Sequence, residues 1–317
     1  MNNSFVLEPK IRKVVVKLTN KCNLTCKHCY VSSHPNGEFG LNVDTVENII
    51  DDCYNLFGKL LFTISGGESL IREDDTIHLL EYAKQYHKIA LYTNGTLLNK
   101  KVCSRIQRLS PIIQFSIDGS NAESHNYMRG IGAFEKTIDG IRTLLDSGLP
   151  GENIQIFSTI TESTVNEITE IIELAESLGI KRVRFEPVAK TGRAVQNWGE
   201  IPVAGSDRDT EKYLNYVKSN KNWNKDWNIE TRQDLNFNLL KIYSDGSVLP
   251  YAFYNEADKK QGCLGNVNSS SLKEILAPSN FTGKVLSKFF RVASGPPRSL
   301  KAIQFIKNDC ITKWDIL

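Results

Sequence analysis

Three cysteines stand close together near the start of the chain, in the segment KLTNKCNLTCKHCY. Cys22, Cys26 and Cys29 come directly after a β-type run, which places them in the loop at the end of a strand. Thiolates are the usual protein ligands of iron–sulfur clusters, and three of them can hold three irons of a cubane. The fourth iron then keeps an open position, which a metal site needs in order to bind and activate a substrate.

A structural zinc site is the alternative explanation of the same cysteines. Zinc in such sites takes a fourth Cys or His ligand close by. His28 lies between two of the cysteines, where its geometry is poor, and His34 is the better candidate. The spacing favours the cluster over zinc but leaves both explanations open.

Three further loops carry small polar residues where predicted strands end. SGGES, residues 65–69, follows the second β-type run, TNG (93–95) the third and SIDG (116–119) the fourth. In a barrel of parallel strands the carboxyl ends meet at one mouth, so these loops and the cysteine loop are expected to surround one site. Each motif alone is an ordinary turn sequence. Together with the cysteine loop, however, they make four polar loops that each follow directly after a predicted strand, and coincidence is a poor explanation for that.

The elements that position these loops alternate between β-type and helical patterns. Helical spacing is found at 46–57, 77–87 and 164–179, the last closing with Gly179. The β-type runs are 14–18, 60–64, 89–93, 112–117, 154–159 and 182–185. Such alternation requires parallel pairing with helical crossovers. Because a full eight-fold barrel needs ~250 residues, the α/β fold predicted here is a partial (β/α)6 barrel.

Beyond about residue 190 the pattern changes. Residues 190–208 are polar and aperiodic, and are interpreted as a linker or as a loop covering the barrel mouth. A helix-like segment (211–219), a hairpin turning at Asp245-Gly246, and short helical patches at 272–275 and 285–290 follow. The predicted domains are therefore a core at 1–195 and a smaller C-terminal part at 196–317.

Composition excludes several classes of function. The net charge of +3, from 39 basic and 36 acidic residues, is too small and too mixed to indicate nucleic-acid binding. No apolar run approaches the ~20 residues that a membrane helix needs, and the N-terminal sequence is not a secretory signal. A cytoplasmic, reducing compartment is expected, where the seven cysteines serve as ligands or free thiols.

The sequence resembles the radical SAM superfamily. CNLTCKHC matches its CxxxCxxC signature and SGGES its GGE motif. SIDGSNAESHNYMRGIGAFEKTIDGI and FEPVAKTGRA are similar to the branch with SPASM or shortened "twitch" C-terminal domains, many members of which modify ribosomally made peptides. The resemblance covers roughly residues 12–195. The fold it implies is the radical SAM partial barrel with a small SPASM-like extension.

The resemblance also implies the cofactors. Cys22, Cys26 and Cys29 would ligate a [4Fe–4S] cluster whose open iron chelates S-adenosyl-L-methionine. One electron from the reduced cluster would cleave that cofactor, and the 5′-deoxyadenosyl radical would take a hydrogen atom from the substrate. The electron would come from an external donor of the flavodoxin or ferredoxin type.

Each remaining motif is implied to bind one part of S-adenosylmethionine. Glu68 and the backbone of Gly66 and Gly67 would receive the amine, and Arg129 would pair with the carboxylate. Ser116 and Asp118 would lie near the ribose. The adenine would be bounded by the backbone around His28 and Tyr30 and by Thr93 and Asn94.

The C-terminal third departs from the SPASM pattern. SDGSVLPY matches it up to Pro250, but Tyr251 stands where the first auxiliary-cluster cysteine is expected, and only Cys263 and Cys310 remain. Two thiolates cannot supply the four ligands of a self-contained cluster, so no auxiliary cluster is expected. The substrate radical would then be quenched by a hydrogen donor such as the Cys263 thiol, couple to another site, or return its electron to the first cluster.

Three classes of function are weighed. The favoured substrate is a ribosomally made peptide, which would be crosslinked, oxidised or epimerised. Only 21 residues precede Cys22, so leader recognition would fall to a separate leader-peptide-binding protein or to the C-terminal part. The nearest rival acts on a small molecule such as an aminocyclitol or sugar. A non-catalytic metal-binding regulator would keep the cysteines but has no need of Glu68, Asp118 and Arg129.

We predict that the protein, reconstituted without oxygen, binds about four irons and four sulfides per chain and is brown. Replacing Cys22, Cys26 and Cys29 together with Ala removes the colour and the iron, because no thiolates remain at the site. Iron and sulfide assays with the absorbance spectrum measure this. About eight irons would reveal an auxiliary cluster, and stoichiometric zinc without iron would contradict the cluster assignment.

Overall fold

The structure, a computed structural model, describes residues 11–38, 40–201, 228–230, 239–250 and 262–277. Six parallel strands pair in chain order and form the centre of the fold. They are β1 (Lys13–Lys17), β2 (Leu61–Ser65), β3 (Lys88–Thr93), β4 (Ile112–Ser116), β5 (Ile154–Ile160) and β6 (Arg182–Pro187). All six coincide with a predicted β-type run to within two residues at either end, and the predicted parallel (β/α)6 arrangement is confirmed.

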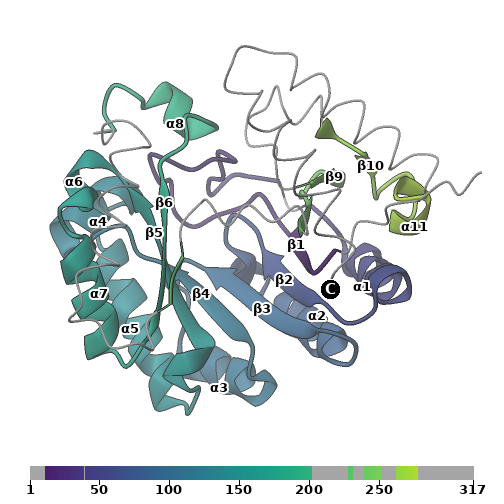
Figure 1. Cartoon of the computed structure of the whole chain (residues 1–317), viewed down its shortest axis with the longest axis horizontal. Helices are drawn as coiled ribbons and strands as arrows, with labels where there is room; N and C mark the ends of the chain where they lie inside the picture. Colours follow the sequence, from purple (N-terminus) through teal and green to yellow (C-terminus); the bar gives the residue numbers. More distant parts are fainter. Residues whose placement is uncertain (1–10, 39, 202–227, 231–238, 251–261, 278–317) are drawn as a thin grey trace, which may run out of the picture.

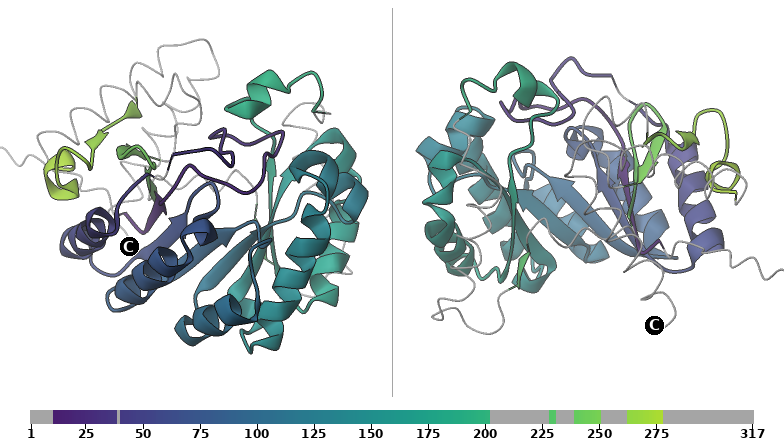
Figure 2. Two further views of the ribbon diagram at one scale, coloured as in Figure 1. Left: turned by 180° about the vertical axis from the view of Figure 1, so that it is seen from behind. Right: turned by 45° about the horizontal axis from the view of Figure 1, so that its top comes forward.

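Helices connect the strands and lie on one side of the sheet, so that the curled sheet has a helix-covered outer face and a concave inner face (Figures 1 and 2). The connecting helices are α1 (Val43–Phe57), α2 (Glu73–Lys84), α3 (Lys100–Leu109), α4 (Ala122–Arg129), α5 (Ala133–Asp146), α6 (Glu162–Val165) and α7 (Ile168–Ser177). Short 3-10 turns, η1 (Ser69–Arg72) and η2 (Gly151–Asn153), complete the connections, and α8 (Arg193–Gln196) follows β6.

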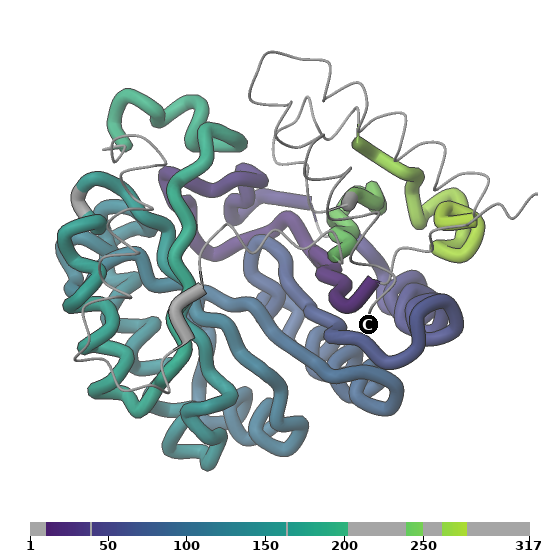
Figure 3. Tube along the Cα trace, in the orientation of Figure 1, coloured from purple at the N-terminus to yellow at the C-terminus, as the bar shows by residue number. Residues whose placement is uncertain are grey.

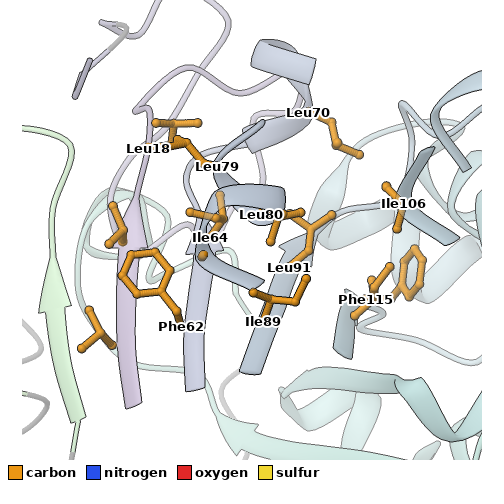
Figure 4. Close-up of a cluster of buried hydrophobic side chains, with 14 of the residues drawn as sticks. Leu18, Phe62, Ile64, Leu70, Leu79, Leu80, Ile89, Leu91, Ile106 and Phe115 are labelled. Carbon is orange, nitrogen blue, oxygen red and sulfur yellow. The ribbon is translucent and has the colours of Figure 1, made fainter. Parts of the chain in front are cut away.

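The apolar core lies between the outer face of the sheet and these helices. Alternate strand residues such as Phe62, Ile64 and Phe115 are fully buried there against Leu79 and Leu80 of α2 and their neighbours (Figure 4). The period of two in the strands and of 3.6 in the helices explains this packing. In the helical pattern predicted at 46–57, the apolar residues Val46, Ile49, Ile50 and Cys53 of α1 are buried, and Phe57 is partly buried against the same core.

The residues beyond the six units continue the same sheet. β8 (Leu239–Ile242) pairs in parallel with β1, and β7 (Asn228–Glu230) pairs in parallel with β6. β9 (Ser247–Pro250) turns back on β8 through Asp245-Gly246, which confirms the predicted hairpin. β10 (Gly265–Asn266) and α11 (Leu272–Ile275) follow, the latter matching its predicted range. Strand β1 is thus an interior strand of a sheet with ten strands among the described residues, although no signal in the sequence indicated its pairing with β8.

Several other predictions have plain outcomes. The segment 164–179 forms α7 after the short helix α6, and the left-handed Gly179 follows directly after the C-cap of α7. In the part of the chain that the structure describes, no helix has the length and apolarity to cross a membrane. The predicted helices at 211–219 and 285–290, together with Tyr251 and Cys310, lie outside the described residues.

Candidate active site

The cysteine loop, residues 18–38, leaves the carboxyl end of β1 and contains all three cysteines of the motif. Cys22 and Cys26 are buried and Cys29 is partly buried. The Leu24 amide donates a hydrogen bond to Cys22 Sγ at 3.4 Å, and the Ser33 amide donates to Cys29 Sγ at 3.3 Å. Amide donors of this kind stabilise a thiolate and tune the potential of a cluster bound to it.

The donor set fits a multi-iron cluster better than a single ion. Within the described ranges, no group of three or more His, Cys, Asp and Glu side chains is arranged to hold one metal ion. A zinc ion needs its ligands ~2.0–2.3 Å from a single point, whereas a cluster lets each thiolate bind a different iron. His34 is exposed and pairs through its backbone with Lys21. The zinc alternative therefore has no support from the geometry.

Burial raises the pKa of two of the cysteines, Cys22 and Cys26. Desolvation raises the pKa of Cys22 to about 12, with smaller contributions from Glu68 and the other two thiols. Desolvation also raises the pKa of Cys26, against the opposing effect of Arg129. Without iron these side chains are thiols, so binding of the cluster must release their protons.

The GGE motif is packed directly against the cysteine loop. The Gly67 amide donates to the Thr19 carbonyl at 2.7 Å, and the Glu68 amide donates to the Lys21 carbonyl at 2.9 Å. A Cβ on Gly67 would lie 2.5 Å from the Lys21 carbonyl oxygen, and one on Gly66 3.0 Å from that of Thr19. Gly67 is therefore required for this close approach of two backbones, and Gly66 leaves little room for a side chain.

Glu68 joins the ends of β2 and β3. Its side chain is fully buried, and its carboxylate accepts hydrogen bonds from the Leu70 amide, the Thr93 hydroxyl and the Asn94 amide at 2.7–3.0 Å. Burial raises the pKa of Glu68, while these donors act in the opposite direction. The side-chain amide of Asn94 donates from Nδ2 to Asn23 Oδ1, and the same nitrogen lies 3.9 Å from Cys22 Sγ. Three predicted site residues, Glu68, Thr93 and Asn94, thus lie together beside the first cysteine.

A buried ion-pair network contacts the cysteine loop at His28. Asp118 Oδ2 lies 2.6 Å from Arg129 Nε and 3.2 Å from His28 Nε2, and Asp118 Oδ1 accepts the Thr159 amide at 2.8 Å. Burial alone would raise the pKa of Asp118, but Arg129 and His28 outweigh it and hold that pKa well below its usual range. Asp118 and Arg129, predicted separately to bind ribose and carboxylate, form an ion pair with each other.

His125 completes the surroundings of this pair. Its Nδ1 accepts the Asp118 amide at 3.3 Å, and the ring is buried. Burial, followed by the charge of Arg129, lowers the pKa of His125 to about 3. His125 is therefore neutral near pH 7 and adds no charge to the ion pair.

The segment after β6 clasps the cysteine loop (Figure 3). The Arg193 guanidinium donates to the carbonyls of Cys26, at 2.7 Å, and of Ser33. Its backbone amide donates to the Cys29 carbonyl, and Asn197 donates to the Lys27 carbonyl. Up to Ile201 this segment is therefore packed against the cysteine loop and is not a free linker, while residues 202–208 lie outside the described ranges. That the segment covers the barrel mouth stays a prediction.

The remaining predicted residues occupy distinct positions. Ser116 ends β4 and is partly buried. Tyr30 is partly exposed, with the Lys17 ammonium 4.1 Å from its ring centre. Cys263 precedes β10 and donates from Sγ to the Gly265 carbonyl at 3.1 Å. Sequence reasoning missed Arg193 altogether, although its TGRA segment was noted, and it discounted the side chain of His28.

Comparison with known families decides the classification. The family model of the radical SAM superfamily matches residues 16–175, which include the cysteine loop, the GGE motif and Asp118. The chain belongs to the radical SAM superfamily. Members of this superfamily use a [4Fe–4S] cluster and S-adenosylmethionine, as the resemblance implied.

Individual relatives differ in what they do. An AdoMet-dependent heme synthase of Methanosarcina barkeri is 35% identical over 220 residues, which cover 66% of this chain and 60% of the relative. The mycofactocin maturase MftC of Mycolicibacterium smegmatis is 28% identical over 62% of this chain and 50% of the relative. The chain thus spans only about half to three fifths of the length of these relatives.

A solved structure shares the fold over most of its length. AnSMEcpe with bound AdoMet and Kp18Cys peptide aligns with a TM-score of 0.66 at 19% identity, covering 87% of this chain and 83% of that one. At this level of identity the likeness establishes the fold. The radical SAM barrel predicted from the sequence is confirmed by this match and by the family model.

Replacing Asp118 with Asn is expected to destabilise the metal-free protein by ~3–5 kcal/mol at pH 7, because Arg129 loses its buried counter-charge. The lowered folded-state pKa means that the unfolded chain takes up the proton first as pH falls. The stabilisation is therefore complete above about pH 4, the unfolded value, and is lost below it. Urea unfolding of wild type and Asp118→Asn, carried out from pH 7 to below about pH 4, measures the difference in their free energies of unfolding. The surface variant Asp74→Asn is the control. A pH-independent difference would contradict the charge argument.

Arg193 is expected to hold the cysteine loop around the cluster. In Arg193→Met two charge-assisted hydrogen bonds to backbone carbonyls disappear, and the cluster should be lost to a chelator about tenfold faster or more. Arg193→Lys keeps the charge but not the two-pronged geometry, so its rate should lie between those of wild type and Arg193→Met. Bleaching of the cluster absorbance gives the rates, and the exposed Arg142→Met serves as control. Equal rates in all four proteins would show that the clasp has no role in retention.

Proposed function

We propose that the protein uses its [4Fe–4S] cluster to cleave S-adenosylmethionine and that the resulting 5′-deoxyadenosyl radical abstracts hydrogen from a ribosomally made peptide. The observation that supports it most is the convergence of the three cysteines, Glu68 and the Asp118–Arg129 pair at the carboxyl ends of β1 to β4. MftC is a maturase, and anSMEcpe was solved with a peptide bound. These relatives favour a peptide substrate.

The proposed roles of the residues are those that the resemblance to the superfamily implies, with Glu68 and Asp118 adjusted to the contacts described above. Cys22, Cys26 and Cys29 bind the cluster, which supplies the electron. Glu68 fixes the loop whose backbone, at Gly66 and Gly67, receives the amine of S-adenosylmethionine. Ser116 borders the ribose, and Thr93, Asn94 and Tyr30 border the adenine.

Arg129 and Asp118 act as a pair in this proposal. A guanidinium has five N–H donors, and Asp118 engages the Nε side of Arg129. The other donors can receive the carboxylate of S-adenosylmethionine. Both oxygens of Asp118 already have protein partners. Its proposed contribution is therefore to orient Arg129 and His28, in addition to lying near the ribose.

The C-terminal sequence leaves more than one fate open for the substrate radical. With few cysteines there, we propose either an oxidative outcome, such as a crosslink, or quenching by the Cys263 thiol with epimerisation. The radical chemistry needs a reducing compartment, which agrees with free thiols and a cytoplasmic location. A flavodoxin- or ferredoxin-type donor would supply the electron, and a separate leader-binding protein would present the peptide.

A second candidate function has support of its own. The heme synthase is 35% identical to this chain, compared with 28% for MftC. A small-molecule reaction on a porphyrin-type substrate is therefore the alternative, in place of the aminocyclitol or sugar considered from the sequence.

With a strong reductant, the reconstituted protein should convert S-adenosylmethionine to 5′-deoxyadenosine and methionine. Arg129→Lys should weaken binding of S-adenosylmethionine about tenfold or more, because an ammonium cannot serve Asp118 and a carboxylate in the same fork geometry. Equilibrium binding and product chromatography measure both quantities, and Arg105→Lys, in a surface ion pair, is the matched control. Absence of 5′-deoxyadenosine from protein with a full cluster would overturn the proposed function.

Co-expression with short precursor peptides, followed by mass spectrometry, separates the outcomes. An oxidised product is two mass units lighter than its precursor and is unaffected by Cys263→Ala. Epimerisation leaves the mass unchanged in ordinary water and adds one deuterium in deuterated water, which Cys263→Ala should abolish. Modification of a porphyrin but of no peptide would support the second candidate.

A further inference from the structure

The turn between β8 and β9 is braced by a segment to which the proposed function gives no role. Asp245 and Gly246 make the turn. Asn266 and Asn268 both donate from Nδ2 to the Asp245 carbonyl, at 2.8 and 3.1 Å. The Gly246 carbonyl accepts the Val267 amide at 2.9 Å. The SDG turn and the GNVN segment (265–268) of the SPASM-like part therefore build one hairpin that is held from outside at its turn.

One face of this hairpin packs against the cysteine loop. Because β8 is parallel to β1, the turn stands at the same edge of the sheet as that loop (Figure 1). Alternate residues of the hairpin enter the main core, and the residues between them face the other way. Of these, Tyr243 and Leu249 are buried and pack with Val31 in an apolar cluster separate from that core. Val31 is two positions after Cys29, so the hairpin contacts the loop just beyond its third cysteine.

Aromatic rings and ammonium groups extend this contact. The Lys17 ammonium of β1 lies 4.1 Å from the ring centre of Tyr30 and 5.8 Å from that of Tyr243. The Lys241 ammonium of β8 lies 5.3 Å from the ring centre of Tyr30. A cation within about 6 Å of the centre of an aromatic ring is attracted to it. Tyr30, which directly follows Cys29, is therefore held by one cation from β1 and one from the hairpin.

The hairpin also contacts the chain where it returns from the cysteine loop toward α1. Gly40 has a φ of +98°, in the left-handed region that favours glycine. A Cβ on Gly40 would lie 2.8 Å from Ser244 Cβ and 2.9 Å from the Leu18 carbonyl oxygen. The chain therefore passes between the start of the cysteine loop and the hairpin turn, with no room for a side chain. The hairpin thus meets this region at two separate places.

We propose that the β8–β9 hairpin is a positioning element for the cluster, which fixes Tyr30 and Val31 and through them the position of Cys29. The inference rests on the assignment of the cysteines to the cluster in the proposed function. The SDG and GNVN segments then serve to hold the hairpin in place. The C-terminal part contributes in this way to the first cluster, although its cysteines are too few for a cluster of its own.

The first measurement is the rate at which a chelator removes iron from the reconstituted protein. Val31→Ala and Tyr243→Leu should each release iron about three- to tenfold faster than wild type. Tyr243→Phe keeps the ring and should restore most of the retention. The double variant Val31→Ala/Tyr243→Leu should be no faster than the faster single variant, because both changes remove the same contact. The exposed Val195→Ala is the matched control for the valine.

A second measurement separates positioning from a general loss of stability. Leu79 of α2 lies in the main core rather than in the apolar cluster around Tyr243. Leu79→Ala should lower the free energy of unfolding but leave the release of iron slower than in Tyr243→Leu. The electron paramagnetic resonance spectrum of the reduced cluster should change in Tyr243→Leu at equal iron content, because the surroundings of Cys29 change. The same spectrum should stay unchanged in Leu79→Ala.

Three results would overturn the proposal. One is release of iron at the wild-type rate in both Val31→Ala and Tyr243→Leu. Another is a double variant whose acceleration equals the product of the two single effects, since the side chains would then act independently. The third is equal acceleration by Leu79→Ala. These rates need only a bound cluster, so failure of the proposed function is seen separately, as absence of 5′-deoxyadenosine from wild type that carries its full cluster.

Discussion

The loop between β1 and α1 carries the cysteines without a helix or strand to hold it, and its internal hydrogen bonds, such as that from Cys22 to His34, leave several carbonyls for partners outside the loop. Those partners come from three directions. The GGE backbone binds the carbonyls of Thr19 and Lys21, and Arg193 binds those of Cys26 and Ser33. The Asp118 network holds the loop through His28. The position of the three sulfurs is thus determined by residues in the segments that follow β2, β4 and β6.

Because the cysteine loop depends on contacts from other elements, Glu68 and Asp118 both connect those elements and orient neighbouring residues at the site. Glu68 and Asp118 are fully buried carboxylates that would be costly to bury alone. Amide and hydroxyl donors compensate Glu68, and cations compensate Asp118. Each carboxylate fastens two elements together at the site, and in doing so leaves its neighbours, Asn94 and Arg129, oriented toward the cysteines.

The sequence was sufficient where the signal was local. Strands β1 to β6 follow from runs of apolar residues, and the site loops follow from motifs at their ends. Relations between distant residues left no comparable trace. Arg193 contacts Cys26 across 167 positions, and nothing in the TGRA segment indicates which carbonyls it binds. Likewise, spacing could place Asp118 and Arg129 in one site but could not show that each is the other's partner rather than the cofactor's.

The pairing of β8 with β1 has a consequence for how the molecule is made. Lys13 pairs with Leu239, so one side of β1 stays open while the ribosome synthesises everything between them. During that time the run KVVVKL is an uncovered edge of a growing parallel sheet, the kind of edge that recruits other chains. Closing so long a loop is entropically slow. The lysines at both ends of β1 are charged side chains of the sort that discourage mispairing at an edge. They would therefore oppose pairing of β1 with other chains until β8 has been synthesised and pairs with it.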